Sequence, residues 1–158
     1  MKVYIKFLIF LFTKSLFFVF FVMLSLVFIL NLLTELDFFK KLEVEIYFPL
    51  FLSLLNSPDL LFEIFPFIFL ITTQLFFIRL FEDKEIEIFK YSGLKNSKII
   101  KILSITSFLA GIMIIFLFYN FSSSLKNFYL ELKSNYTNDG KYLAVITKNG
   151  LWIKDKIN

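Results

Sequence analysis

The chain has 158 residues, of which 58% are hydrophobic and 21% aromatic, and its formal net charge is +4. Soluble domains are usually about 45–50% apolar, and a chain this short cannot bury such an excess in one aqueous core, so the composition excludes an ordinary soluble domain. The sequence contains neither Cys nor His, which excludes disulfides, thiolate chemistry and Cys/His metal sites. The lysines lie between apolar runs rather than in one basic stripe, so we expect no nucleic-acid partner. No catalytic site and no cofactor are expected either.

The first apolar stretch predicts a membrane span over about residues 15–34. Within it, Leu16 to Leu33 is uncharged and approaches the roughly 20 residues that cross the hydrocarbon layer. Residues 1–13 suit an interfacial or entering helix whose lysines reach the headgroups. The stretch is too long for an ordinary signal peptide and no small-residue cleavage site follows it, so we expect it to be retained.

A second span is predicted over about residues 58–80. The apolar piece at 46–56 before it is too short to cross and is expected to lie along the membrane surface. Ser57 is expected to cap the span and Pro58 to occupy its first turn, where a missing N–H costs nothing. Pro66 is expected to kink it.

A third span is predicted over about residues 98–121, with Ser97 able to cap it. The following segment, 122–158, is polar and carries two β-rich pieces joined by Asn149-Gly150, which is a hairpin signal. The predicted fold is therefore an α-helical membrane protein with about three transmembrane helices in residues 1–121, followed by the first strands of a water-exposed β domain.

The distribution of Lys and Arg predicts the orientation. Both the N-terminus and residues 79–101 are rich in these residues, whereas the first polar segment, 34–45, has only Lys40 and Lys41. The positive-inside rule then places the N-terminus and segment 79–101 in the cytoplasm, and segment 34–45 and the C-terminal tail outside.

Segment 79–101 also predicts a short amphipathic helix over about residues 83–92. Asp83 can cap its start, and Gly93 suits the left-handed position that closes a helix. The helix has an apolar side made of Ile86, Ile88 and Phe89. A solvated connector is the commonest fate of such a loop. The functional alternative is a coupling helix that docks in an apolar, Arg-lined groove of a soluble ATPase.

Two motifs in the chain resemble one known family. Glu85-Ile-Glu-Ile-Phe-Lys-Tyr-Ser-Gly93, followed by Leu94, resembles the cytoplasmic loop of the LptF/LptG lipopolysaccharide export permeases. Asn149-Gly-Leu-Trp-Ile-Lys-Asp155 is similar to the start of the periplasmic domain in LptG-type members. The positions of Pro58 and Pro66 also resemble those in the family's second helix.

The resemblance implies an architecture and a set of partners. Family members have three helices, a periplasmic β-jellyroll and three more helices, so the chain as given resembles their N-terminal half, with 122–158 as a truncated jellyroll start in a fragment or split-gene half. The implied partners are a dimeric cytoplasmic ABC ATPase, a second homologous permease subunit, periplasmic bridge proteins and lipopolysaccharide. ATP is hydrolysed by the ATPase, so the chain is not expected to be an enzyme.

The resemblance also implies roles for the coupling helix. Glu85 matches the family's coupling-helix carboxylate and is expected to contact an Arg of the ATPase. The apolar residues Ile86, Ile88 and Phe89 would be buried in the same groove, and Gly93 would set the turn into the third span.

Two further residues are candidates for facing the substrate. Asn31 lies nearest to the position where LptG-type members carry a lysine for lipopolysaccharide phosphate. Glu63 is an ionisable residue in the outer third of the second span, where it either meets a polar partner or substrate or is simply hydrated.

Two other classes of function stay open. A small autonomous membrane protein, such as a pore-forming or holin-like peptide or an assembly factor, would have no ATPase partner and no reason for the Gly-Leu-Trp tail. A membrane enzyme is the weaker alternative, because without His or Cys only scattered carboxylates remain for catalysis.

Overall fold

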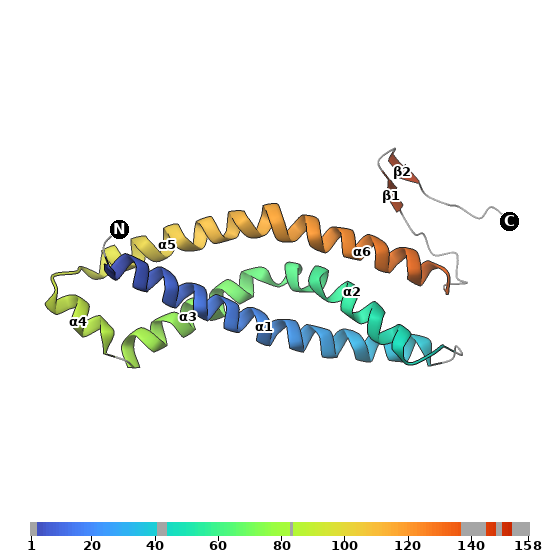
Figure 1. Ribbon diagram of the computed structural model, residues 1–158, viewed down its shortest axis with the longest axis horizontal. Coiled ribbons are helices and arrows are strands. Elements are labelled where there is room, and N and C mark those ends of the chain that lie inside the picture. The colour runs from blue at the N-terminus through green and yellow to red at the C-terminus, as the bar shows by residue number, and fades with distance from the viewer. Residues whose placement is uncertain (1–2, 41–43, 83, 137–144, 148–149, 153–158) are drawn as a thin grey trace.

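The computed structural model of the chain describes residues 3–40, 44–82, 84–136, 145–147 and 150–152, and its helices form one elongated bundle (Figure 1). In chain order the elements are α1 (Val3–Phe39), α2 (Tyr47–Glu63), α3 (Phe65–Glu82), α4 (Glu85–Tyr91), α5 (Asn96–Met113), the π-helical segment η1 (Ile114–Phe118), α6 (Tyr119–Ser134), β1 (Val145–Thr147) and β2 (Gly150–Trp152).

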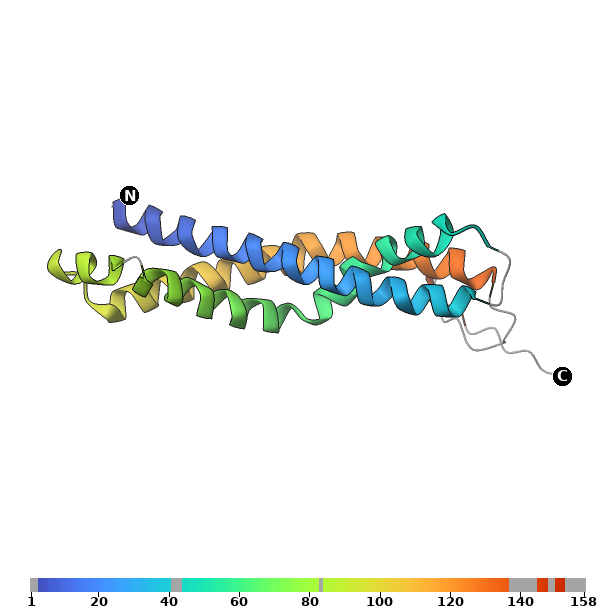
Figure 2. The same ribbon diagram turned by 90° about the horizontal axis from the view of Figure 1, so that it is seen from below.

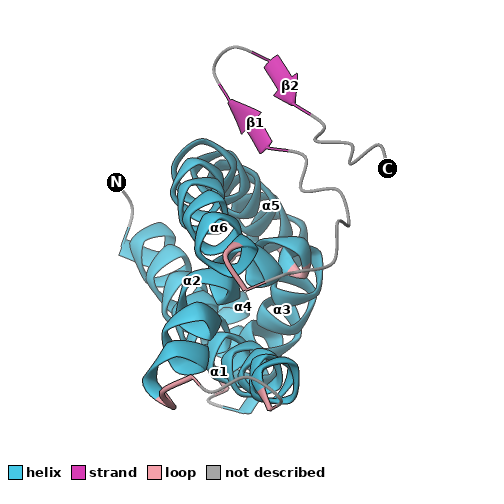
Figure 3. Ribbon diagram, turned by 90° about the vertical axis from the view of Figure 1, so that its right-hand side faces the viewer, coloured by secondary structure: helices cyan, strands magenta, loops and turns pink. Residues whose placement is uncertain are grey.

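Three rows of helix run along the bundle: α1, then α2 with α3, then α5 with α6 (Figure 1). The short helix α4 lies at one end, beside the start of α1, as a second view also shows (Figure 2). Seen along the bundle axis, the three rows of helix are grouped around a common centre and do not form one flat layer (Figure 3). The two ends of the bundle therefore carry different elements.

Among the described residues, three helices are long and apolar enough to cross a membrane: Val3–Phe39, Phe65–Glu82 and Asn96–Ser134. This confirms the predicted number of spans. Many of their large apolar side chains are exposed, as expected of helices that are solvated by lipid rather than by water.

Helix α1 is longer than the predicted first span. It runs unbroken for 37 residues, so the expected entering helix and the expected span form one element. At roughly 1.5 Å per residue it is about 55 Å long, well beyond the hydrocarbon layer of about 30 Å.

The second span begins and breaks at other places than predicted. Ser57 does not cap it, because Ser57 lies inside α2 and its hydroxyl donates to the carbonyl of Ser53 (2.6 Å). Pro58 is likewise inside α2. The chain breaks at Ile64, and Pro66 occupies the first turn of α3. A proline at 66 cannot donate to the carbonyl four residues earlier, which accounts for a break rather than a kink.

Residues 46–56, expected to lie along the membrane surface, are not a separate element of the structure. Most of them form the first part of α2, which runs antiparallel to α1 and packs against both α1 and α6 (Figure 1). This part of α2 is buried between two other helices. Its residues Leu52 and Leu55 pack in a hydrophobic cluster with Phe39 of α1 and Tyr129 of α6.

The third span also differs from its prediction. Helix continues through α5, η1 and α6 to Ser134, so the expected domain boundary at residue 122 falls inside a helix. Ser97 is not the cap, since α5 starts at Asn96 after Lys95 and no side chain caps it. The polar side chains of α6 are stabilised as helix because they meet polar groups of α1 and α2, described below.

The strands β1 and β2 pair antiparallel, with Thr147 opposite Gly150, where the sequence predicts a hairpin. The turn residue Asn149 and the flanking segments 142–144 and 153–155 lie outside the described residues. That this hairpin begins a jellyroll stays a prediction.

Candidate coupling surface and polar cavity

Helix α4 is a separate short helix with well-defined ends. Glu85 and Glu87 lie in its first turn and Lys90 in its last, as the helix dipole favours. The expected cap, Asp83, lies outside the described residues. Gly93 has φ +75°, which confirms the predicted left-handed position. Its N–H bonds to the Lys90 carbonyl at 2.9 Å, as in a Schellman motif.

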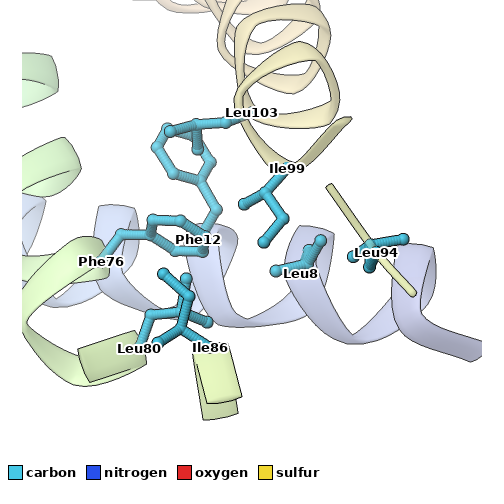
Figure 4. Close-up of a cluster of buried hydrophobic side chains, with 8 residues drawn as sticks. All are labelled: Leu8, Phe12, Phe76, Leu80, Ile86, Leu94, Ile99 and Leu103. Carbon is cyan, nitrogen blue, oxygen red and sulfur yellow. The ribbon is translucent and has the colours of Figure 1, made fainter. Parts of the chain in front are cut away.

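Ile86 anchors α4 to the body of the bundle. Its side chain is only 9% exposed and points into a hydrophobic cluster, shown in Figure 4. We call this set the coupling-end cluster, and it consists of Leu8, Phe12, Phe76, Leu80, Ile86, Leu94, Ile99 and Leu103. The cluster draws on α1, α3 and α5 as well as α4. Through Ile86, α4 is therefore packed against the ends of all three spans.

The other predicted coupling residues of α4 face an open groove. The groove has a volume of about 460 Å³ and is lined chiefly by Val3, Tyr4 and Phe7 of α1 and by Glu85, Ile88 and Phe89 of α4. Ile88 is 60% exposed. The ring of Phe89 lies 6.0 Å from that of Phe7, centroid to centroid. The structure thus brings three of the predicted residues together, turns Ile86 inward and uses Gly93 in the turn.

An open pocket lies between α1, α2 and α6, toward the end of the bundle opposite α4, and we call it the polar cavity for the polar side chains that it contains, although most of its lining is apolar. Its volume is about 460 Å³, and its polar lining consists of Asn31, Thr34, Glu35, Asn56, Glu63, Tyr129 and Lys133. The two predicted substrate-facing residues, Asn31 and Glu63, therefore line the same cavity although they come from different helices. Apolar side chains complete the wall: Val27, Leu30, Leu60 and Ile64.

The core of this cavity is an ion pair between α1 and α6. Glu35 is 1% exposed, and its two carboxylate oxygens lie 2.8 and 2.9 Å from the ammonium nitrogen of Lys133. The hydroxyl of Tyr129 donates to the same carboxylate at 2.7 Å and accepts from Lys133 at 2.7 Å. The ammonium also lies 4.5 Å from the ring centroid of Phe38. A buried carboxylate needs such partners, since an unpaired charge would be costly there.

A second hydrogen-bonded chain, which contains two amides, links α1 and α6 to α2. The ammonium of Lys126 donates to Asn56 Oδ1 at 2.6 Å, and Asn56 Nδ2 donates to Asn31 Oδ1 at 3.0 Å. Asn31 Nδ2 in turn donates to the carbonyl of Ser53 at 3.1 Å. Lys126 also pairs with Asp59 at 3.2 Å. Asn31, predicted to face the substrate, is thus first of all a link between α1 and α2.

Sequence reasoning missed the α6 part of this site. Lys126, Tyr129 and Lys133 are spaced three and four residues apart and share one helix face. Similarly, Glu35 lies one turn after Asn31. This periodicity is the signal in the sequence that indicates a polar helix face. The prediction that the helical domain ends at residue 121 leaves these residues outside it.

Comparison with known proteins gives one match. The sequence profile of a family described as "Lipopolysaccharide export system permease LptF/LptG" matches residues 6–158. No curated relative and no solved structure matches the chain. The matched region includes both α4 and the helices that line the polar cavity.

Proposed function

Because the chain belongs to the LptF/LptG family of lipopolysaccharide export permeases, we propose that it is a permease subunit of an ABC transporter, coupled to a separate cytoplasmic ATPase. Family membership and three apolar helices support a multi-pass inner-membrane protein, and membership of a permease family favours a transporter component over a catalytic enzyme. In the proposed role it extracts lipopolysaccharide from the inner membrane and passes it towards the outer membrane. The other proposed partners are a second homologous permease subunit and periplasmic bridge proteins.

The observation that carries the proposal is the placement of α1. Near its start, Leu8 and Phe12 pack in the coupling-end cluster around Ile86. Near its other end, Asn31 and Glu35 line the polar cavity. These positions are about 30–40 Å apart along one unbroken helix. A transporter needs such a connection, because ATP is hydrolysed on one side of the membrane and the lipid is released on the other.

We assign the α4 end to the cytoplasm, as the excess of Lys and Arg in segment 79–101 supports. In this assignment the groove between α1 and α4 receives the ATPase. Glu85, half-buried at the groove wall, pairs with an Arg of the ATPase, while Ile88 and Phe89 supply apolar contact. Ile86 and Gly93 position the helix and do not touch the partner.

The same assignment places the polar cavity near the periplasmic face. Polar and ionisable side chains are expensive inside a membrane and are usually retained for function. A lipid headgroup is the polar group that a permease of this family must lift out of the bilayer. We therefore propose that the headgroup of the substrate enters this cavity, with Glu63 at its edge.

Retention of the ATPase by the purified chain tests the proposal. Glu85→Ala removes one partner of a buried charge pair, which costs about 2–5 kcal/mol at interfaces, so we expect ATPase retention to fall at least tenfold. Membrane insertion should be unchanged. Glu87→Ala is the matched control, because Glu87 is an exposed carboxylate in the same first turn and does not line the groove.

Wild-type ATPase yield and activity with Glu85→Ala would contradict the assignment of α4. A labelled cysteine at position 85 that reacts from the periplasm would contradict the orientation. Nothing in the described part of the chain favours the alternative of a small autonomous membrane protein, which predicts that no ATPase is retained by any variant.

A further inference from the structure

We propose that the polar cavity binds an uncharged, hydroxyl-bearing sugar part of the lipid headgroup and disfavours a bare phosphate group. This inference rests on the proposed function, since it requires the headgroup to enter the cavity. It adds which chemical part of the headgroup the cavity selects. The argument depends on how the cations near the cavity are used.

The first cation, Lys133, has no donor left for a phosphate. An ammonium group has three N–H donors. In this site they meet the two oxygens of Glu35, at 2.8 and 2.9 Å, and the hydroxyl of Tyr129, at 2.7 Å. A phosphate could bind Lys133 only by displacing the Tyr129 hydroxyl or Glu35, and Glu35 is 1% exposed and would then be left buried without its cation.

The second cation, Lys126, is engaged in the same way. It donates to Asn56 at 2.6 Å and pairs with the carboxylate of Asp59 at 3.2 Å. Its charge is therefore neutralised by Asp59, and it does not line the cavity. Neither lysine offers an unneutralised charge to an anion.

The remaining charge at the cavity is negative. Glu63 is exposed at the wall and forms no ion pair with any residue that the structure describes. The charges of Glu35 and Lys133 cancel each other, so the side chains that line the cavity carry one net negative charge, that of Glu63. A phosphate about 6–8 Å from Glu63 would be repelled by roughly 1 kcal/mol at an effective dielectric constant of about 40, which is about five- to tenfold in occupancy.

The neutral groups of the lining suit hydroxyls. The amides of Asn31 and Asn56 each keep one N–H beyond the bonds described above, and the Thr34 oxygen can still accept although its hydroxyl donates to Leu30. Sugar hydroxyls both donate and accept, so different hydroxyls of one ring can accept from these amides and donate to Glu63. The apolar wall formed by Leu30, Leu60 and their neighbours can pack against the C–H face of the ring.

Protection of an introduced thiol tests this selectivity. The chain has no cysteine of its own, so Leu60→Cys places a single thiol in the apolar wall of the cavity. The full chain is reconstituted in phosphatidylcholine vesicles containing lipid A with both phosphates or lipid A with both phosphates removed. The rate of labelling by N-ethylmaleimide is then measured. Ile88→Cys, at the other end of the bundle, controls for general effects of the lipid.

We expect the dephosphorylated lipid to slow labelling at position 60 about five- to tenfold more than the phosphorylated lipid. Adding Glu63→Gln should shrink this difference, because it removes the repelling charge. Equal or stronger protection by the phosphorylated lipid would overturn the inference and leave the proposed function standing. No protection by either lipid would overturn both the inference and the placement of the headgroup here. Coupling to the ATPase would still be decided separately by the Glu85→Ala test.

Discussion

Replacing Glu35 by Gln removes the charge that joins α1 to α6 and keeps the size of the side chain. The wild-type carboxylate is 1% exposed, with both oxygens within 2.9 Å of the Lys133 ammonium and a third bond, at 2.7 Å, from Tyr129. In Glu35→Gln the ammonium stays where it is but faces an uncharged amide. The substitution should therefore lower the free energy of unfolding, because the buried ammonium no longer has a charged partner.

The structure sets the size of the effect. Breaking a buried ion pair by removing one partner costs about 3–5 kcal/mol. The side chain of Lys133 is 21% exposed, so water can partly solvate its charge. We therefore expect Glu35→Gln to lower the free energy of unfolding by about 2–3 kcal/mol.

A double-mutant cycle separates the pair from its surroundings. Glu35→Gln, Lys133→Gln and the double variant are unfolded in mixed micelles with increasing SDS and followed by circular dichroism. The double variant should be less destabilised than the sum of the single ones, by about 1–2 kcal/mol. Asp37→Asn is the control, because Asp37 is an exposed carboxylate two residues further along α1, and it should change stability by less than about 0.5 kcal/mol.

A Glu35→Gln variant as stable as Asp37→Asn would refute this reasoning. So would a coupling energy near zero, since Glu35 and Lys133 would then not stabilise one another across the two helices. In either case, some other interaction would have to explain why residues 122–134 are helical.

Three further predictions concern single side chains. Ile86→Ala should destabilise the α4 end by about 2–4 kcal/mol and speed hydrogen exchange in α4, because it opens a hole in the coupling-end cluster. Gly93→Ala should cost about 1 kcal/mol in thermal unfolding: nothing lies within 4 Å of the added Cβ, so only the left-handed backbone opposes it, and Gly93→Asn should cost less. Lys126→Met should cost about 1–2 kcal/mol in SDS unfolding, because it leaves the buried Asn56 oxygen without its donor and Asp59 without its cation.

The spans and helix α4 could be predicted because their signals are local. Long apolar runs define the number of crossings, and Gly93 closes α4 by its own backbone preference. The helix over 122–134 could not be predicted in this way. The polar residues of this helix predict a solvent-exposed tail, because the sequence does not show that α1 and α2 supply partners such as Glu35 and Asp59.

The candidate site was predictable to a similar extent. Glu85, Ile88 and Phe89 do line one groove, but the sequence could not tell that Ile86 turns inward, because both sides of a short helix can be apolar. Asn31 follows from the family resemblance and Glu63 from its charge within a span, and neither signal indicates that the two residues line one cavity. The pair of Glu35 and Lys133, 98 positions apart, has no local signature and required the packed helices.

Helix α1 is stiff as well as long, and this has a mechanical consequence. An unbroken helix of 37 residues acts as a lever arm, so a tilt of about 5° imposed at the α4 end moves the far end by about 5 Å. That distance is comparable to the width of a sugar ring. A small rocking of the α4 end would therefore be enough to widen or narrow the mouth of the polar cavity by about that distance.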